Sequence, residues 1–196
     1  MMLLIAGLAL FFAIHLLPLN RPLRDGLATR FGENAYKGVF SVVALIALIL
    51  IVMGFHKMQL MVGSKNPIVW FPPDWTRHVT FLFMLPAMIL LVAAYVPSRI
   101  RAATKHPMLA AVKVWAVGHL IANGDAASIV LFGGFLAWAV YSRIALKRQG
   151  DLGAGGKDAP ILNDVLVVVV GLALYAFMLI WGHTWLIGVP LLRGGA

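Results

Sequence analysis

The stretch Lys105–Ser128, KHPMLAAVKVWAVGHLIANGDAAS, places histidine, lysine and aspartate inside or beside an apolar run. Between Pro107 and Gly124 this stretch is long enough to cross most of a bilayer as a helix. Ionisable side chains at that depth are costly, and they usually mark a functional site. The stretch therefore predicts a membrane helix that carries a polar site.

The composition of the whole chain also indicates a membrane protein. Of the 196 residues, 62% are hydrophobic and only 12% are charged. A water-soluble domain of this make-up would have too few polar side chains to cover its surface. The formal net charge of +9 comes from Lys and Arg that lie between apolar runs, which favours membrane topology over nucleic-acid binding. Because the sequence has no cysteine, any metal or haem centre depends chiefly on the six histidines.

Six apolar segments come near the roughly 20 residues that a spanning helix needs. They cover residues 1–19, 39–55, 79–96, 107–122, 126–142 and 161 to about 186. We therefore predict an all-α, polytopic integral membrane protein with about six transmembrane helices in one bundle, forming a single domain over residues 1–196. Five spans plus a re-entrant segment is the alternative.

The basic residues predict the orientation of the chain. Eleven Lys and Arg fall in the loops after the first, third and fifth segments, and four fall in the opposite-side segments. Because basic loops stay in the cytoplasm, both termini are expected outside. The first segment has no basic residue before it and no small-residue cleavage site, so we expect a retained helix and not a signal peptide.

His119 is the first candidate for chemistry. On a helix, Trp115 and His119 lie one turn apart on the same face, and Gly118 lets a neighbouring helix or a flat macrocycle approach closely. Three interpretations fit His119: a neutral histidine that bonds another helix, a metal or haem ligand, and a proton carrier. His15 is a second intramembrane histidine, and histidines on two helices are a standard way to hold b-type haem.

Two further histidines lie at the ends of predicted spans. His106 precedes Pro107, a favourable first helical residue, and is kept as a secondary ligand candidate. His183 lies beside Trp181 and Trp185, and this trio is interpreted as an interfacial aromatic cluster.

Two loop segments are also informative. Asn123-Gly124-Asp125 is interpreted as a tight turn in which Asp125 caps the next helix, with orientation of a histidine as the alternative role. The outer loop 56–78 is rich in aromatic residues and proline, which favours either an aromatic belt or an interfacial lid.

The chain resembles the NnrU family of bacterial membrane proteins over nearly its whole length. The family is named for a link to nitrite and nitric oxide respiration. The resemblance implies a multi-pass protein of the bacterial inner membrane with periplasmic termini, acting as a redox, sensing or accessory component, with a respiratory nitrite or nitric oxide reductase as partner. The residues that carry it are His15, the segments 20–24 and 30–37 (RFGENAYK), Phe40, Ser41, His106-Pro107, Trp115, His119 and Asn123-Gly124-Asp125.

The same layout is similar to the NnrU-like domain of the plastid 15-cis-zeta-carotene isomerases. That domain has an early intramembrane histidine, and a His-Pro pair with a second histidine thirteen positions on, as His119 follows His106 here. In the isomerases the early and later histidines ligate haem b, which implies His15 and His119 as axial ligands in this chain. The residues implied around such a haem are Trp115 against the porphyrin, Arg21, Arg24 or Lys113 at the propionates, and Asn123 or Asp125 near the ligands.

Other pairings and functions stay open at this point. Straight helices would place His15 and His119 at depths roughly 10–15 Å apart, so His15 with His106, and His119 with His183 or Asp125, are alternative pairs. A cofactor-free membrane assembly or transport factor is one alternative function. The other is a membrane enzyme, either isomerase-like or a methyltransferase that uses S-adenosylmethionine, since His106-Pro107 also resembles a motif of the isoprenylcysteine carboxyl methyltransferases.

Overall fold

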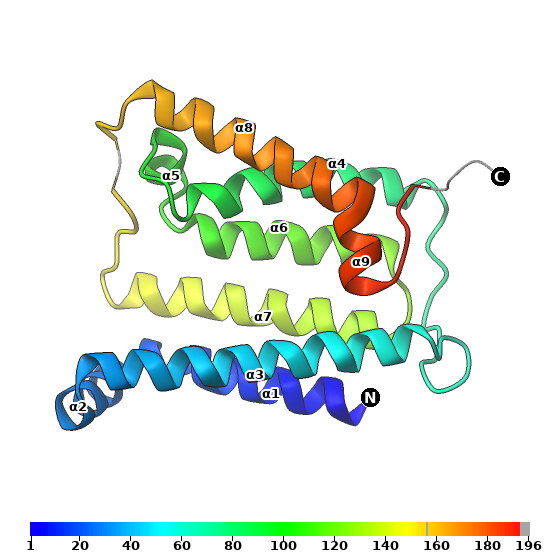
Figure 1. The fold of residues 1–196 in the computed structure, drawn as a ribbon, viewed down its shortest axis with the longest axis horizontal. Coiled ribbons are helices and arrows are strands. Elements are labelled where there is room, and N and C mark those ends of the chain that lie inside the picture. Colours follow the sequence, from blue (N-terminus) through cyan, green and yellow to red (C-terminus); the bar gives the residue numbers. More distant parts are fainter. Residues whose placement is uncertain (156, 193–196) are drawn as a thin grey trace. The chain divides into compact units, whose positions relative to one another are not determined.

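The computed structural model describes residues 1–155 and 157–192, and the regular structure in that part of the chain is helical apart from two isolated β-bridges (Figure 1). The elements in chain order are α1 (Met2–Leu16), η1 (Leu17–Leu19), α2 (Arg21–Phe31), α3 (Glu33–Gln59), α4 (Thr76–Ala93), α5 (Arg99–Thr104), α6 (Pro107–Ala122), α7 (Ala126–Arg148), α8 (Ile161–Phe177), the π-helical turn η2 (Met178–Gly182) and α9 (His183–Ile187).

The predicted class, an all-α polytopic membrane protein, is confirmed. Within the described residues, five helical stretches are long and apolar enough to cross a membrane: 2–19, 33–59, 76–93, 126–148 and 161–187. The sixth predicted segment is helix α6, whose 16 residues rise about 24 Å against a hydrocarbon core of about 30 Å. Helix α3 begins before the predicted apolar segment because Glu33 and Lys37 form an (i, i+4) ion pair that supports a helix.

These helices carry apolar side chains on their exposed faces as well as on the faces that pack against other helices. In the most apolar 18-residue part of each stretch, only 17–28% is buried inside the protein. Large side chains such as Val39, Leu45 and Leu166 are 63%, 58% and 48% exposed. A lipid bilayer is therefore the environment that this surface fits.

The described chain forms two compact units. The first comprises residues 1–69 and 125–134, and the second comprises residues 70–124 and the chain from 135 onwards. The single domain over residues 1–196 stays a prediction.

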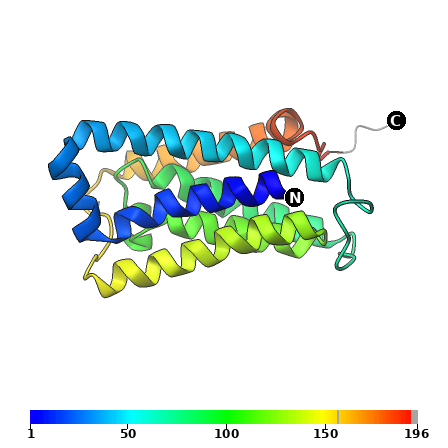
Figure 2. The same cartoon turned by 90° about the horizontal axis from the view of Figure 1, so that it is seen from below.

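In the first unit, α1 packs antiparallel against α3 through glycines (Figure 2). A Cβ on Gly54 would lie 2.5 Å from the backbone nitrogen of Leu4, and one on Gly7 would lie 2.8 Å from the nitrogen of Ile51. Small residues at a helix contact allow the two backbones to approach this closely. The glycines therefore fix where α1 lies on α3.

A buried polar cluster fixes the start of α7 in the first unit. Asp125 caps this helix as predicted, because its Oδ1 accepts a hydrogen bond from the backbone nitrogen of Ser128 at 3.0 Å. The same carboxylate accepts hydrogen bonds from Asn66 Nδ2 at 2.7 Å and from Gln59 Nε2 at 3.2 Å. Burial alone would raise the pKa of Asp125, but the hydrogen bonds from Ser128, Asn66 and Gln59 together outweigh it, and the pKa is lowered.

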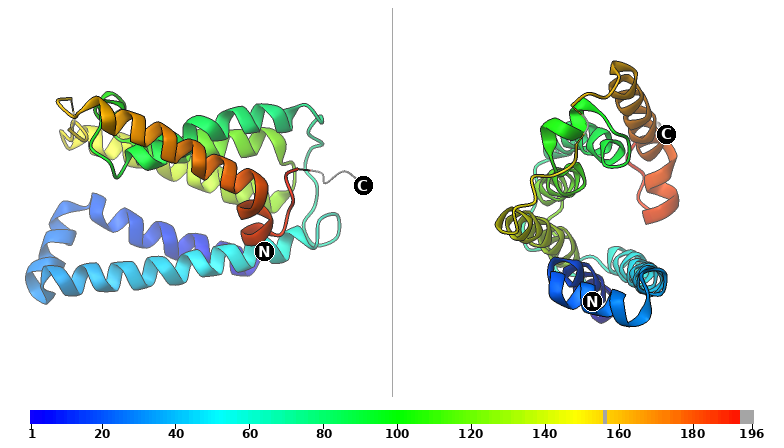
Figure 3. Two further views of the ribbon diagram at one scale, coloured as in Figure 1. Left: turned by 45° about the horizontal axis from the view of Figure 1, so that its top comes forward. Right: turned by 90° about the vertical axis from the view of Figure 1, so that its left-hand side faces the viewer.

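In the second unit, α4 packs against both α6 and α8. Gly118 of α6 faces Phe83 and Met84, since a Cβ on it would lie 2.9 Å from atoms of each side chain. Gly171 of α8 similarly lies against the backbone of Ile89. The chain then bends at η2 between α8 and α9, as the orange-to-red segment of Figure 3 shows.

His106 lies at the opposite end of α6 from Asn123, where the loop after α7 folds onto the α5–α6 turn. The backbone nitrogen of Ala154 donates a hydrogen bond to the carbonyl oxygen of Lys105 at 2.7 Å. His106 is the N-cap residue of α6, and its Nε2 lies 3.6 Å from Asp151 Oδ1, an ion pair when the ring is protonated. His106 therefore contacts the loop that follows α7.

Candidate functional site

Helix α6 carries Trp115 and His119 one turn apart on the same face, as predicted. Their ring centroids are 5.4 Å apart, and Nδ1 of His119 lies 2.9 Å from the carbonyl oxygen of Trp115. Asn123 ends the helix and donates its side-chain amide to the carbonyl of His119 at 2.8 Å. The ring of His119 is thus held at a fixed place near the end of α6.

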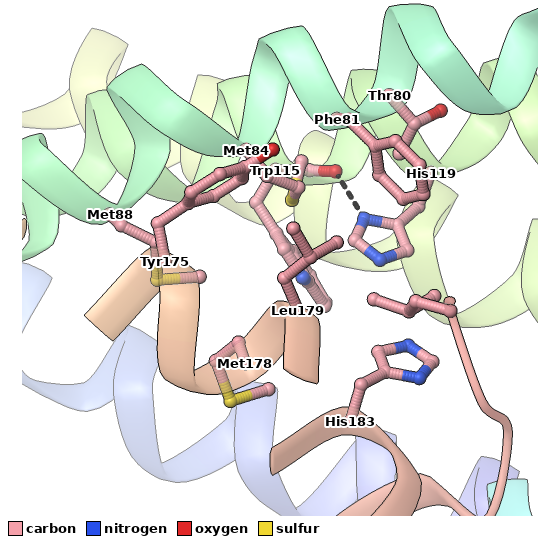
Figure 4. A pocket seen from close by; sticks show the side chains of 11 residues that line it. Thr80, Phe81, Met84, Met88, Trp115, His119, Tyr175, Met178, Leu179 and His183 are labelled. Atoms are coloured by element: carbon pink, nitrogen blue, oxygen red, sulfur yellow. Dashed lines mark hydrogen bonds between the residues drawn. The ribbon is translucent and has the colours of Figure 1, made fainter. Parts of the chain in front are cut away.

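The His119 ring projects into a cavity of the second unit (Figure 4). We call this space of about 80 Å³ the His119 cavity. Its walls are mostly aromatic, aliphatic and thioether side chains, and an imidazole in such surroundings needs a defined partner. The lining residues are Thr80, Phe81, Met84, Met88, Trp115, His119, Tyr175, Met178, Leu179, His183 and Leu191.

The π-helical turn η2 brings a second histidine to this cavity. Residues five apart do not share a face of an α-helix, but the wider π turn aligns Met178 with His183, and both line the cavity. Gly188 then ends α9 with a φ of +83°, which reverses the chain. The carbonyl oxygen of Val189 consequently lies 2.7 Å from Nδ1 of His183.

The backbone sets the tautomer of three histidines. Nδ1 of His15 lies 2.8 Å from the carbonyl oxygen of Phe11. The corresponding distances are 2.9 Å from His119 to Trp115 and 2.7 Å from His183 to Val189. A carbonyl only accepts, so Nδ1 is the donor and Nε2 carries the lone pair. Histidines that ligate metals usually donate their other nitrogen in this way. All three therefore make the Nδ1 contact that is usual for a metal-ligating histidine.

His15 belongs to the first unit, where aromatic rings surround it. Its ring stacks on Phe11 with centroids 3.8 Å apart and meets the edge of Phe40 at 5.1 Å. His119 belongs to the second unit, so the pairing of His15 with His119 stays a prediction. Within the second unit the structure brings His119 together with His183, which is one of the alternative pairs.

The remaining predicted site residues lie at several places. Lys113 is half-buried on α6 and is not among the residues of the His119 cavity. In the first unit, Arg21 is exposed at the start of α2, and Arg24 pairs with Asp25 and Glu33. Asp125, also in the first unit, is the helix cap described above.

His106 is also separate from this cavity. It lies thirteen residues before His119, roughly 20 Å along α6. Of the predicted group, the structure therefore gathers Trp115, His119 and Asn123 at one end of that helix.

A second cavity of about 280 Å³ adjoins the first and shares Thr80, Phe81, His183 and Leu191 with it. Arg77 and Asn123 also line it, and Arg77 Nη2 donates to the carbonyl of Leu191 at 3.1 Å. Sequence reasoning missed Arg77 as a site residue. Its only signal was a basic residue directly before an apolar segment, which topology alone accounts for.

The donor set of the His119 cavity fits haem iron, because imidazoles with Nε2 as acceptor are its usual axial ligands. Pockets that hold drug-sized ligands measure about 300–1,000 Å³, so the cavity of about 80 Å³ reaches that range only when joined to its neighbour. Within the described residues, no group of three or more His, Cys, Asp or Glu could hold a bare metal ion. The site is thus an apolar cavity with two imidazole side chains, those of His119 and His183, in its lining.

The fold and this site define a multi-pass helical membrane protein with a histidine-bearing apolar cavity. The chain matches the family model described as NnrU protein over residues 3–191, and it therefore belongs to the NnrU family. Neither the curated proteins nor the solved structures contain a match to it.

Proposed function

We propose that this NnrU family member binds haem b in the bacterial inner membrane, with both termini periplasmic. Its role would be in nitrite and nitric oxide metabolism, as a redox, sensing or accessory component beside a respiratory nitrite or nitric oxide reductase. The observation that carries the proposal is His119, whose Nδ1 is bonded to the Trp115 carbonyl while its ring projects into an apolar cavity. Family membership supports the same role.

The chain's own residues would take distinct roles around the haem. His119 is one axial ligand, and His15 is the other by the family resemblance. Trp115 packs beside the ligand ring, and Asn123 holds the carbonyl of His119. Arg21, Arg24 and Lys113 remain proposed partners of the propionates, and Arg77 joins them because it lines the adjoining cavity. When bound, haem would supply reversible one-electron chemistry.

The test is a reduced-minus-oxidised absorption spectrum of the detergent-purified protein, with a pyridine haemochrome assay on the same sample. We expect a b-type signal near one haem per chain, and loss of the Soret band in His119→Ala. The matched control is His56→Ala, because His56 is exposed on α3. Absence of haem after haem-supplemented expression, or an unchanged spectrum in His119→Ala, would reject the assigned role.

A second candidate function is a cofactor-free assembly or transport factor, and one observation favours it. Polar groups in the chain bond segments to one another, as when Thr80 Oγ1 of α4 donates to the Gly118 carbonyl of α6 at 2.7 Å. In that case His119→Ala would change no spectrum and would lower stability by about 0.6–2 kcal/mol. The haemochrome assay separates the two candidates.

A further inference from the structure

An apolar groove lies at the end of the first unit where α1 turns into α2. We call it the α2 groove, and its volume is about 330 Å³, within the range of ligand-binding pockets. The groove presents no polar surface. Its walls come from α1, η1, α2 and α3 and include Leu17, Leu27, Phe31, Ala35, Tyr36 and Phe40. A ligand that fills it must be hydrocarbon at that end.

Helix α2 has the pattern of a helix that lies in the membrane interface. Leu23, Leu27 and Phe31 follow one another at spacings of four, which places them on one face. Leu23 is 50% exposed and Phe31 is 61% exposed, which is unfavourable in water. Arg30 lies three residues after Leu27 and seven after Leu23, so it borders this apolar face, whereas Asp25 lies on the opposite side of the helix. A short helix of this kind lies flat at the boundary between headgroups and acyl chains.

The charges around the groove are not balanced. Residues 20–37 contain four basic side chains and two acidic ones. Glu33 pairs with Arg24 at 2.5 Å and with Lys37 at 3.3 Å, and Asp25 pairs with Arg24 at 3.0 Å. Within the described chain, Arg21 and Arg30 have no carboxylate at ion-pair distance. Positive charge is therefore left over at this end of the first unit.

One of these uncompensated arginines is attached directly to the wall of the groove. The guanidinium carbon of Arg30 lies 5.3 Å from the ring centroid of Phe31, whose side chain lines the groove. The guanidinium carbon of Arg24 lies in the same manner over the ring of Tyr36, 5.5 Å from its centroid. Arg24, however, already forms ion pairs with both Asp25 and Glu33. A cation thus stands beside an apolar slot, which is the arrangement that an anionic amphiphile fits.

We propose that the α2 groove binds one acyl chain of an anionic phospholipid, with the lipid phosphate at Arg30. The apolar walls select a hydrocarbon chain, and the uncompensated arginine selects a negative headgroup over a zwitterionic one. One such cation contributes about a fivefold preference for an anionic lipid. None of the proposed axial ligands lines this groove, and Phe40, which lines it, also contacts the His15 ring.

The experiment is native mass spectrometry of the delipidated full chain with equal amounts of phosphatidylglycerol and phosphatidylcholine. The wild-type protein is expected to retain phosphatidylglycerol about fivefold over phosphatidylcholine. Arg30→Gln is expected to lose that preference, and Ala35→Trp, which fills the groove, is expected to lose tightly bound lipid of both kinds. The matched controls are Lys57→Gln, an exposed cation on α3, and Ala173→Trp, an exposed position on α8.

Three results would overturn the proposal. Equal retention of the two lipids by the wild-type chain would show that a neutral amphiphile suffices. Unchanged binding in Ala35→Trp would place the lipid elsewhere, and an equal loss in the two controls would show a non-specific annulus. If circular dichroism shows that Ala35→Trp does not fold, the preference measured in Arg30→Gln decides alone.

Discussion

Asn66 donates its side-chain amide to Oδ1 of Asp125 at 2.7 Å, across 59 residues of sequence. Asn66 is fully buried and Asp125 is 7% exposed. Asn66 also donates to the carbonyl of Met58 at 3.3 Å and accepts from the backbone nitrogen of Ala127 at 2.9 Å. One amide therefore ties the end of α3, the following loop and the start of α7 together.

Asn66→Ala should destabilise the protein because it leaves these partners buried and unsatisfied. A buried group that loses its hydrogen bond costs about 1–3 kcal/mol. Unfolding in sodium dodecyl sulfate, followed by circular dichroism, measures the change. The matched control is Asn34→Ala, because Asn34 is exposed and should change stability by less than about 0.5 kcal/mol. Equal stability of the two variants would mean that the cluster contributes nothing.

Asp125 should make stability depend on pH in the acid range. Its pKa in the folded protein is lowered below the ordinary value of 3.8, despite burial, by the hydrogen bonds from Ser128, Asn66 and Gln59. Its stabilisation is therefore present above the ordinary value and is lost as pH falls through the folded pKa. The unfolding free energy measured from about pH 6 to about pH 3 should fall less steeply in Asp125→Asn than in the wild-type chain. Identical slopes would contradict this assignment.

Gly54→Ala should separate α1 from α3. The added Cβ would lie 2.5 Å from the backbone nitrogen of Leu4, and backbone cannot move aside as a flexible side chain can. Overpacking of this kind costs about 1–3 kcal/mol. Gly38→Ala is the control on the same helix, since no atom lies within 4 Å of its Cβ position and alanine favours a helix by about 1 kcal/mol. Detergent unfolding should therefore shift in opposite directions for the two variants.

The sequence predicted the elements well and the site only in part. The apolar segments predicted the spans, and Asp125 was predicted as the cap of the next helix, because these features depend on local patterns. The predicted tight turn was wrong: Asn123 is extended, with φ −125° and ψ 120°, and the carbonyl of Gly124 accepts a hydrogen bond from the backbone nitrogen of Trp70 at 3.2 Å. The place of His183 depends on the π turn, whose register follows from the packing of Met178 and Phe177 around Gly182. Local propensity carries no signal for that arrangement.

Contacts between distant segments escaped prediction for the same reason. Asn66 carries no local signal of its role, because its partner Asp125 lies 59 residues away. Met84, Met178 and Arg77 likewise line the two cavities through packing that no local pattern indicates. Each of these residues gains its role from a partner far away in the sequence.

The second axial ligand of the proposed haem can be assigned by spectroscopy. Family resemblance implies His15, whereas the structure places His183 in the cavity of His119. Both donate Nδ1 to a backbone carbonyl, at 2.8 Å from Phe11 and 2.7 Å from Val189, as metal-ligating histidines usually do. As long as His119 still holds the iron, removal of the second histidine would leave the haem five-coordinate and high-spin. We expect that change, together with new carbon monoxide binding, in His15→Ala, while His183→Ala keeps the low-spin spectrum and near-normal haem content. The reverse result would assign His183 as the ligand and leave haem binding itself intact, whereas an unchanged low-spin spectrum in both variants would remove both histidines from the iron.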